Sequence, residues 1–359
     1  MNSKRKLLTL PGLIDIHVHL REPGQTHKED FASGTMAALA GGFTMVLDMP
    51  NNLLPITSKH SLDMKITAAR RTTACDLGFY FGSLGDNTAE FKKVYKRVTG
   101  LKLYLNQTTG GYIIDTSKMK AIYRAWHRLT KTKPILLHAE DDVIPEVTEV
   151  LSAIKHPTHI CHVSSEKELS AIIRAKKNGL PITCGVCPHH LFLNRNDEKK
   201  LGAFGLMKPS LKTKRDQKFL WKNLDYIDVF ESDHAPHTKQ EKRSKVPPFG
   251  VPGLETTLPL LLTAMDQKKI TLQQIIERCY TNPLRIFHLP EQKQTRIEVE
   301  RRPYTVRGSK LYTKCGWTPF EGWKLQYRVL SVTLRGRQVY GMSTKPAMRT
   351  GRVISSDTA

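Results

Sequence analysis

The chain has 359 residues, of which 39% are hydrophobic and 25% are charged, and its formal net charge is +23. This composition indicates a folded protein with a sizeable core and excludes a membrane-spanning chain, because no apolar run reaches the ~18–20 residues that cross a bilayer. Six scattered cysteines and a basic start without an apolar signal segment argue against a disulfide framework and a secretory signal, so we expect a cytoplasmic protein.

Eight short runs rich in Ile, Val, Leu or aromatic residues predict eight strands. Most begin roughly 25–35 residues apart, the spacing of a strand followed by a crossover helix. Between them, residues 31–39 predict a helix, and Ser165 and Glu168 have the spacing of a capping box for a helix that ends at Gly179. The predicted strands are 12–19, 43–48, 75–81, 98–105, 134–138, 158–162, 181–186 and 226–232.

Apolar strands that alternate with helices predict a parallel sheet buried on both faces, and eight of them predict a closed (β/α)8 TIM-type barrel. We assign residues 12–292 to this barrel. The chain is longer than the ~200–250 residues of a bare barrel, and alternating stretches at 327–334 and 339–341 predict a small β-module built from residues 1–11 and 293–359. We expect a loop at 239–248 and a basic, disordered tail over the last fifteen residues.

The charge and one cysteine pair allow other interpretations. An excess of +23 is compatible with nucleic acid or with steering of small anions, but the Lys and Arg residues are spread along the chain without interleaved aromatic residues. We therefore expect a solvated basic exterior and neither a nucleic-acid nor a membrane partner. Cys184-Gly-Val-Cys187 ends a strand-like run instead of opening a helix, which disfavours a redox or zinc-ribbon motif.

The strongest chemical signal is His17-Val-His19 at the end of the first predicted strand. Residues i and i+2 of a strand face the same side, so both imidazoles can reach one metal ion. Barrel active sites lie at the carboxyl ends of the strands. Four further candidates lie on other strands or directly after them, and a lysine within an apolar strand is costly unless it is neutralised or paired. These candidates are Lys102, His138, His162 and Asp233.

Four segments together resemble a known family. Residues 11–24 and 231–238 are similar to the two signature sequences of dihydroorotases, members of the amidohydrolase superfamily, and residues 188–193 and 252–259 extend the match. The resemblance covers most of residues 8–290 and includes the dihydroorotase domain of the animal multifunctional pyrimidine-synthesis protein. It implies the reversible cyclisation of N-carbamoyl-L-aspartate to dihydroorotate in pyrimidine biosynthesis.

The resemblance also implies a binuclear zinc site. His17 and His19 would bind one ion, and His138 and His162 would bind the other. Lys102, carboxylated by CO2, would bridge the two ions. In this scheme Asp233 would contact the metal and move the catalytic proton.

Further residues match the positions that hold the substrate, whose ring carboxylate requires cationic or amide donors. Arg21 offers a bidentate fork, although a surface salt bridge is the ordinary alternative. Asn51 also suits a simple turn, and His237 also suits a supporting position. The loop 106–112 has paired glycines that suit a mobile lid, and Thr108 matches the threonine of the family's lid.

Some positions depart from the family pattern. Thr109 stands where the relatives have a bulky aromatic residue, and Lys208 stands where an arginine is expected. The animal enzymes associate Cys161 and a glutamate with an additional metal position. Because that glutamate is Gly185 here, we disfavour a third ion.

Alternatives therefore stay open beside an active dihydroorotase. A hydantoinase or dihydropyrimidinase would use the same metal site, but Arg21 argues against substrates that lack the carboxylate. A catalytically impaired domain retained for assembly would more readily have lost a metal ligand. The resemblance further implies either a free-standing chain or fusion to carbamoyl-phosphate synthetase and aspartate transcarbamoylase, and it allows a homodimer.

Overall fold

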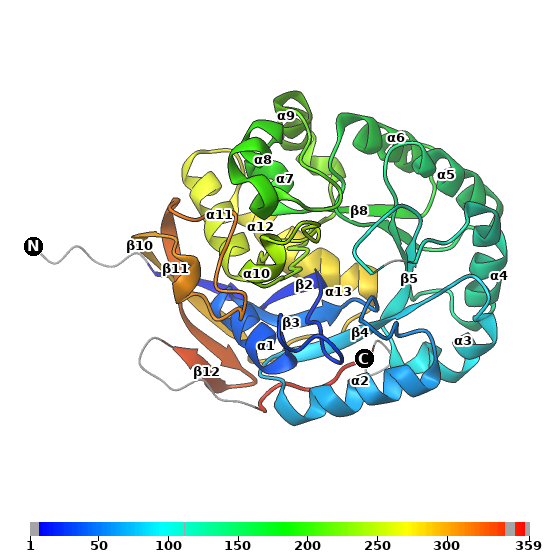
Figure 1. Cartoon of the computed structure of the whole chain (residues 1–359), viewed down its shortest axis with the longest axis horizontal. Coiled ribbons are helices and arrows are strands. Elements are labelled where there is room, and N and C mark those ends of the chain that lie inside the picture. Colours follow the sequence, from blue (N-terminus) through cyan, green and yellow to red (C-terminus); the bar gives the residue numbers. More distant parts are fainter. Residues whose placement is uncertain (1–6, 111, 342–348, 356–359) are drawn as a thin grey trace, which may run out of the picture.

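The computed structural model describes residues 7–110, 112–341 and 349–355. Eight parallel strands follow one another around a barrel, and the helices lie outside it (Figure 1). A parallel bridge between Val18 and His234 joins the two edges of the sheet, and the His19 amide donates to the His234 carbonyl at 2.8 Å. The predicted (β/α)8 barrel is confirmed. Its strands are β2 (Leu13–Val18), β3 (Phe43–Asp48), β4 (Asp76–Gly82), β5 (Gly100–Tyr104), β6 (Ile135–His138), β7 (Thr158–Ile160), β8 (Ile182–Val186) and β9 (Val229–Phe230).

The barrel strands read as continuous apolar runs because both of their faces are buried. In β3 every residue is buried, with Met45 and Leu47 in the interior cluster and Phe43 and Val46 in the cluster under the helices. Phe287, at the end of α13 (Asn282–Phe287), packs into the interior cluster. The apolar packing therefore fills the barrel and leaves its carboxyl-end mouth to the polar side chains.

The helices begin and end where local sequence signals place them. α1 (Phe31–Ala40) agrees with the predicted helix at 31–39, and α6 (Glu166–Lys177) begins after the predicted capping box. The Glu168 amide donates to Ser165 Oγ at 3.1 Å, and Glu168 Oε2 accepts from the Ser165 amide at 3.0 Å. The other helices around the barrel are α2 (Lys59–Thr72), α3 (Thr88–Val94), α4 (Met119–Leu129), α5 (Val143–Ala153), α7 (Pro188–Phe192), α8 (Arg195–Leu201), α9 (Lys214–Lys222), α11 (Leu254–Asp266) and α12 (Leu272–Ile276).

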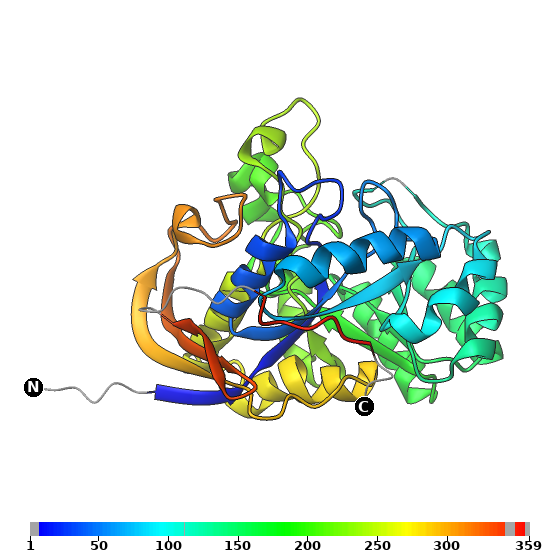
Figure 2. The same cartoon turned by 90° about the horizontal axis from the view of Figure 1, so that it is seen from below.

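A second, antiparallel sheet stands at one side of the barrel (Figures 1 and 2). Its strand order is β1-β10-β11-β12, so it combines the two ends of the chain as the sequence predicted. The division of the chain into a barrel domain of residues 12–292 and a β-module of residues 1–11 and 293–359 stays a prediction. The strands are β1 (Leu7–Pro11), β10 (Arg296–Thr305), β11 (Lys324–Leu334) and β12 (Arg337–Gly341).

Two segments differ from the sequence expectation. Part of the predicted tail lies outside the described residues, but residues 349–355 return to the barrel, where the Ile354 amide donates to the Leu77 carbonyl at 3.0 Å. The Ile354 side chain packs into the interior cluster, and this burial explains why the segment is held. The predicted loop at 239–248 contains a short helix, α10 (Lys239–Lys242), because Thr238 and Glu241 form a capping box.

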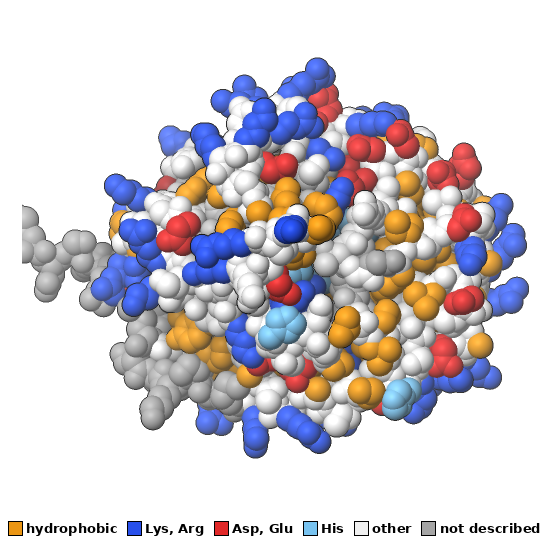
Figure 3. Space-filling view, viewed as in Figure 1, with side chains coloured by type: hydrophobic (Ala, Val, Ile, Leu, Met, Phe, Trp, Pro, Cys, Tyr) orange, Lys and Arg blue, Asp and Glu red, His pale blue; other side chains and the backbone are white. Residues whose placement is uncertain are grey.

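The Lys and Arg side chains on the surface are dispersed, as the sequence predicted. On the face shown in Figure 3, Lys and Arg side chains lie mostly around the edge, with acidic side chains between them. Within the described part of the chain, no helix combines the length and the apolar character needed to cross a bilayer.

Candidate metal centre and active site

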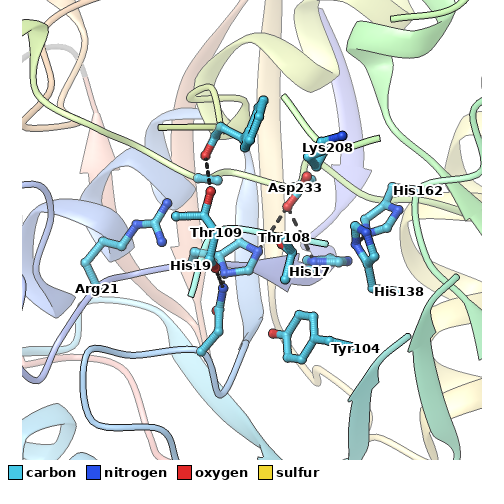
Figure 4. Close-up of a pocket in the computed structure, with 14 residues that line it drawn as sticks. His17, His19, Arg21, Tyr104, Thr108, Thr109, His138, His162, Lys208 and Asp233 are labelled. Atoms are coloured by element: carbon cyan, nitrogen blue, oxygen red, sulfur yellow. Dashed lines mark hydrogen bonds and ion pairs between the residues drawn. The ribbon is translucent and has the colours of Figure 1, made fainter. Parts of the chain in front are cut away.

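Five of the candidate residues line one pocket at the carboxyl-end mouth of the barrel (Figure 4): His17, His19, His138, His162 and Asp233. β2 contains His17 and is followed by His19, β6 ends in His138, and His162 follows β7. His162 and Asp233 have φ values of 41° and 44°, a left-handed conformation that is uncommon outside glycine and is concentrated at functional sites. The structure thus brings together His17, His19, Lys102, His138, His162 and Asp233, all of them buried.

Two of the histidines face one carboxylate. His19 Nε2 lies 3.0 Å and His17 Nε2 lies 3.4 Å from the same oxygen, Asp233 Oδ1. One potential ligand atom from each residue lies within 4.8 Å of the others. Burial raises the pKa of Asp233. Burial lowers the pKa of His17 to about 4, with the charge of Lys102 acting in the same direction, so this imidazole is neutral at pH 7. Neutral imidazole is the form that binds metal ions.

The other two histidines form a second pair. His138 Nδ1 lies 3.0 Å from His162 Nε2, and the ring centroids are 4.6 Å apart with the planes at 67°. His138 Nε2 lies 3.2 Å from Glu140 Oε1. His162 Nδ1 is buried and has no hydrogen-bond partner among the described residues. Burial lowers the pKa of both rings, which keeps them neutral.

Lys102 is buried near both pairs, close enough for its charge to lower the pKa of His17 and of His138. Its Nζ donates to Cys161 Sγ at 3.0 Å and lies 5.1 Å from the centroid of the Tyr104 ring. In the described part of the chain, no carboxylate lies within ion-pair distance of this nitrogen. An ammonium group that is fully buried beside neutral imidazoles is costly. The Cys161 thiol and the Tyr104 ring are therefore the close neighbours of this buried amine.

Arg21 lies across the pocket from His138 and His162 (Figure 4). It is only 4% exposed, so the surface salt bridge that the sequence left open is excluded. Its Nε donates to the Pro236 carbonyl at 3.2 Å, and a terminal nitrogen lies 3.2 Å from His237 Nε2. No carboxylate among the described residues pairs with its guanidinium, which leaves this cation able to bind an anion from outside the protein.

Asn51 connects the candidate metal centre to the loop 106–112. His19 Nδ1 lies 2.6 Å from Asn51 Oδ1, an oxygen that can only accept, so Nδ1 carries the proton and Nε2 is free as a ligand. Asn51 Nδ2 donates to the Thr109 carbonyl at 2.9 Å, and Thr109 Oγ1 donates to the Phe249 carbonyl at 2.8 Å. Thr108 lines the pocket. The described part of the predicted lid therefore lies closed over the mouth, and Gly111 lies outside the described residues.

The structure adds a residue that the sequence reasoning missed. Glu231 is fully buried, and its Oε2 lies 3.3 Å from His17 Nδ1 while Oε1 accepts from the His162 amide. Burial opposes its ionisation, but His17 and His159 lower the pKa of Glu231 below its usual value. The sequence did contain a signal for this residue, because a glutamate at the end of a strand that is buried on both faces needs a buried partner.

Three other predictions concern residues around the pocket. Lys208 lines the pocket, with Nζ 5.1 Å from the centroid of the Phe249 ring. Cys184 lies within β8, as expected. Burial raises the pKa of its thiol to about 12, and a thiol that stays protonated is a poor redox group. The sequence placed the whole Cys184-Gly-Val-Cys187 motif at the end of a strand. Cys187 instead directly precedes a helix, α7.

Comparisons with known proteins agree with this geometry. The Amidohydrolase family matches residues 8–122. The chain is 45% identical to "Multifunctional protein CAD" of Squalus acanthias over 94% of its own length, and it spans only 15% of that protein. It is 37% identical to "Dihydroorotase" of Pyrococcus furiosus, with 92% of this chain and 81% of that protein covered.

A solved structure is also similar. "Inactive dihydroorotase-like domain of Chaetomium thermophilum CAD-like multifunctional protein" aligns with a TM-score of 0.84 and 27% identity, over 98% of this chain and 100% of that one. Similarity of the whole fold therefore does not distinguish an active chain from an inactive one. The residues at the mouth of the barrel determine which of the two a chain is.

Proposed function

Because this chain belongs to the dihydroorotase family of amidohydrolases, we propose that it catalyses the reversible cyclisation of N-carbamoyl-L-aspartate to dihydroorotate. The observation that carries the proposal is the convergence of four neutral histidines, a lysine without a counter-charge and an aspartate at one barrel mouth. An impaired domain that was retained only for assembly would have no need to keep this set intact.

The donor set fits two zinc ions. Imidazole nitrogens and carboxylate oxygens are ordinary zinc ligands, and the unpartnered Nδ1 of His162 is a buried acceptor in need of a partner. His17 and His19 would hold one ion, and His138 and His162 would hold the other. Lys102, carboxylated, would bridge them, since this modification replaces a buried cation with an anionic ligand. When bound, the two ions would lower the pKa of a water molecule and polarise the ring carbonyl.

Asp233 is the proposed proton carrier. In hydrolysis it takes a proton from the attacking water and gives it to the ring nitrogen as the amide bond breaks. In ring closure it takes a proton from the ureido nitrogen that attacks the side-chain carboxyl group, and it returns the proton to the departing oxygen. Its contact with both His17 and His19 holds its carboxylate at the metal centre.

Arg21 is the proposed anchor of the substrate carboxylate, because its guanidinium is buried and unpaired by any described carboxylate. His237 would form the pocket wall beside the guanidinium, with its Nε2 donating to the Phe249 carbonyl. Asn51 would orient His19, and its amide would exchange the Thr109 carbonyl for substrate when the loop opens. Thr108 would contact the substrate from the lid. This set favours an acidic cyclic amide over the neutral substrates of a hydantoinase.

The setting of the reaction is proposed from the relatives. We propose that the chain acts in the cytoplasm, and that it is one domain of a polypeptide with carbamoyl-phosphate synthetase and aspartate transcarbamoylase, with a homodimer as its assembly. Beside Cys161 we propose no additional zinc ion, although Glu231 places a carboxylate next to His17 and Cys161 that Gly185 cannot provide.

The proposal is tested by assaying ring closure of N-carbamoyl-L-aspartate and hydrolysis of a hydantoin on one sample whose zinc content is measured. We expect at least two zinc ions per chain and turnover of the acidic substrate. Zinc-loaded protein that turns over only the hydantoin would identify a hydantoinase. Zinc-loaded protein that turns over neither would identify an impaired domain.

A further inference from the structure

A second cluster of ligating side chains lies in the turn that joins β8 to α7. Cys187, His189 and His190 each present an Sγ or ring nitrogen atom within 4.8 Å of the other two. All three side chains are buried. The ligand atoms of His17, His19 and Asp233 lie within the same limit, and no residue of the proposed catalytic set belongs to this second cluster.

The histidines of this cluster have ring nitrogens without partners. His190 Nε2 lies 3.1 Å from the Pro209 carbonyl, which can only accept, so Nε2 carries the hydrogen. Nδ1 of the neutral ring then carries a free lone pair. This nitrogen is buried and has no hydrogen-bond partner among the described residues. A histidine whose other nitrogen donates to a backbone carbonyl is in the usual state of a metal ligand. His189 Nε2 is also buried and unpartnered within the described part of the chain.

The geometry of the two rings matches that of the proposed zinc ligands. The centroids of His189 and His190 are 4.4 Å apart with their planes at 63°. The corresponding values for His138 and His162 are 4.6 Å and 67°. Simple packing of two rings explains the contact, but it does not explain why two polar nitrogens are buried beside a thiol and away from any donor.

We propose that Cys187, His189 and His190 bind a zinc ion distinct from the catalytic pair. A thiolate with two imidazoles is a donor set that zinc accepts readily. Zinc bonds of ~2.0–2.3 Å place ligand atoms about 3.3–3.8 Å apart, so a small contraction of the cluster is sufficient. On binding, the Cys187 thiol releases its proton to solvent, and the site with its ion carries a net charge of +1.

This ion would stabilise one wall of the catalytic pocket. His190 holds the Pro209 carbonyl, and the adjacent Lys208 lines the pocket. A metal that fixes the 187–190 turn therefore also fixes the segment that carries Lys208. The site also gives a role to the second cysteine of the CxxC motif and to the histidine pair at 189–190, neither of which the proposed reaction uses.

The test is a cobalt titration of the metal-free full chain. Co²⁺ bound by a thiolate gives a sulfur-to-cobalt charge-transfer absorption, whereas the proposed catalytic ligands contain no sulfur. We expect the absorption in the wild type and its loss in Cys187→Ser. Cys184→Ser is the matched control, because Cys184 is also buried in the same motif but its thiol donates to the Tyr226 carbonyl at 3.4 Å. This control should keep the absorption.

A second measurement tests the proposal even if the Cys187→Ser variant does not fold. His189→Gln, checked by circular dichroism, should bind one zinc ion fewer per chain than the wild type. Absorption that persists in Cys187→Ser, or that is absent from the cobalt-saturated wild type, would overturn the proposal. Loss in Cys161→Ser alone would also overturn it, by placing the thiolate beside Lys102. None of these outcomes depends on dihydroorotase activity.

Discussion

The carboxylate of Glu231 lies in the space that a side chain at position 185 would occupy. A Cβ atom built on Gly185 would lie 2.5 Å from Glu231 Oε1. β8 and β9 are adjacent and pair at Gly185 and Val229, so one strand provides the space and its neighbour provides the charged group. The absence of a side chain at 185 is thus a condition for the position of Glu231.

This relationship predicts that Gly185→Ala lowers the free energy of unfolding by about 1–3 kcal/mol, the usual cost of overpacking a core. Chemical denaturation of metal-free protein measures it. The double variant Gly185→Ala/Glu231→Ala should recover most of the loss, because the clashing carboxylate is gone. Additive losses in the double variant would show that the two positions do not compete for space.

Glu231→Gln should weaken zinc retention about 10–100-fold, because an amide orients and polarises His17 less well than a carboxylate does. Competition with a chelator measures the change. The KM for dihydroorotate should move little, since Glu231 lies below the metal ligands and does not line the pocket. Unchanged zinc retention would show that the contact with His17 Nδ1 has no part in metal binding.

Lys102→Ala should abolish turnover and reduce the bound zinc, because the proposed bridging carbamate would be lost. Lys133→Ala is a matched control: Lys133 is also buried, but it donates to the Tyr95 carbonyl at 2.7 Å, away from the mouth. That variant should lose stability and keep its zinc. Normal activity in Lys102→Ala would refute the binuclear site.

Asp233→Asn should retain zinc and reduce kcat by about 10²–10⁴-fold, the range ascribed to general acid–base catalysis. The amide keeps the size of the side chain and loses the ability to accept the proton. Steady-state kinetics on samples of equal zinc content measure the effect. A near-normal kcat would assign the proton transfer to another group.

Arg21→Ala should raise the KM for dihydroorotate about 10- to 100-fold, because a hydrogen bond to a charged group contributes ~1.5–3 kcal/mol. Arg21→Lys should recover only part of this, since it keeps the charge and loses the fork. Hydrolysis of a neutral cyclic imide is the internal comparison. Equal losses on the acidic and the neutral substrate would reject Arg21 as the carboxylate anchor.

The sequence by itself determined the barrel and the residues of the candidate metal centre. Apolar periodicity is a local property, so the run at 43–48 matches β3 residue for residue. The spacing of His17-Val-His19, at the end of β2 and directly after it, predicted two imidazoles on one side. The carboxyl ends of parallel strands meet at one mouth, and therefore His138 and Asp233 could be expected beside that pair.

The tertiary structure alone decided which group fills each space between strands. Neither strand's own sequence shows that Glu231 occupies the volume beside Gly185, that Arg21 is buried without a carboxylate, or that Ile354 returns to the barrel floor. These facts depend on barrel closure, which brings together side chains up to hundreds of residues apart. Local patterns specify the direction of a side chain, but only packing specifies the neighbour that it meets.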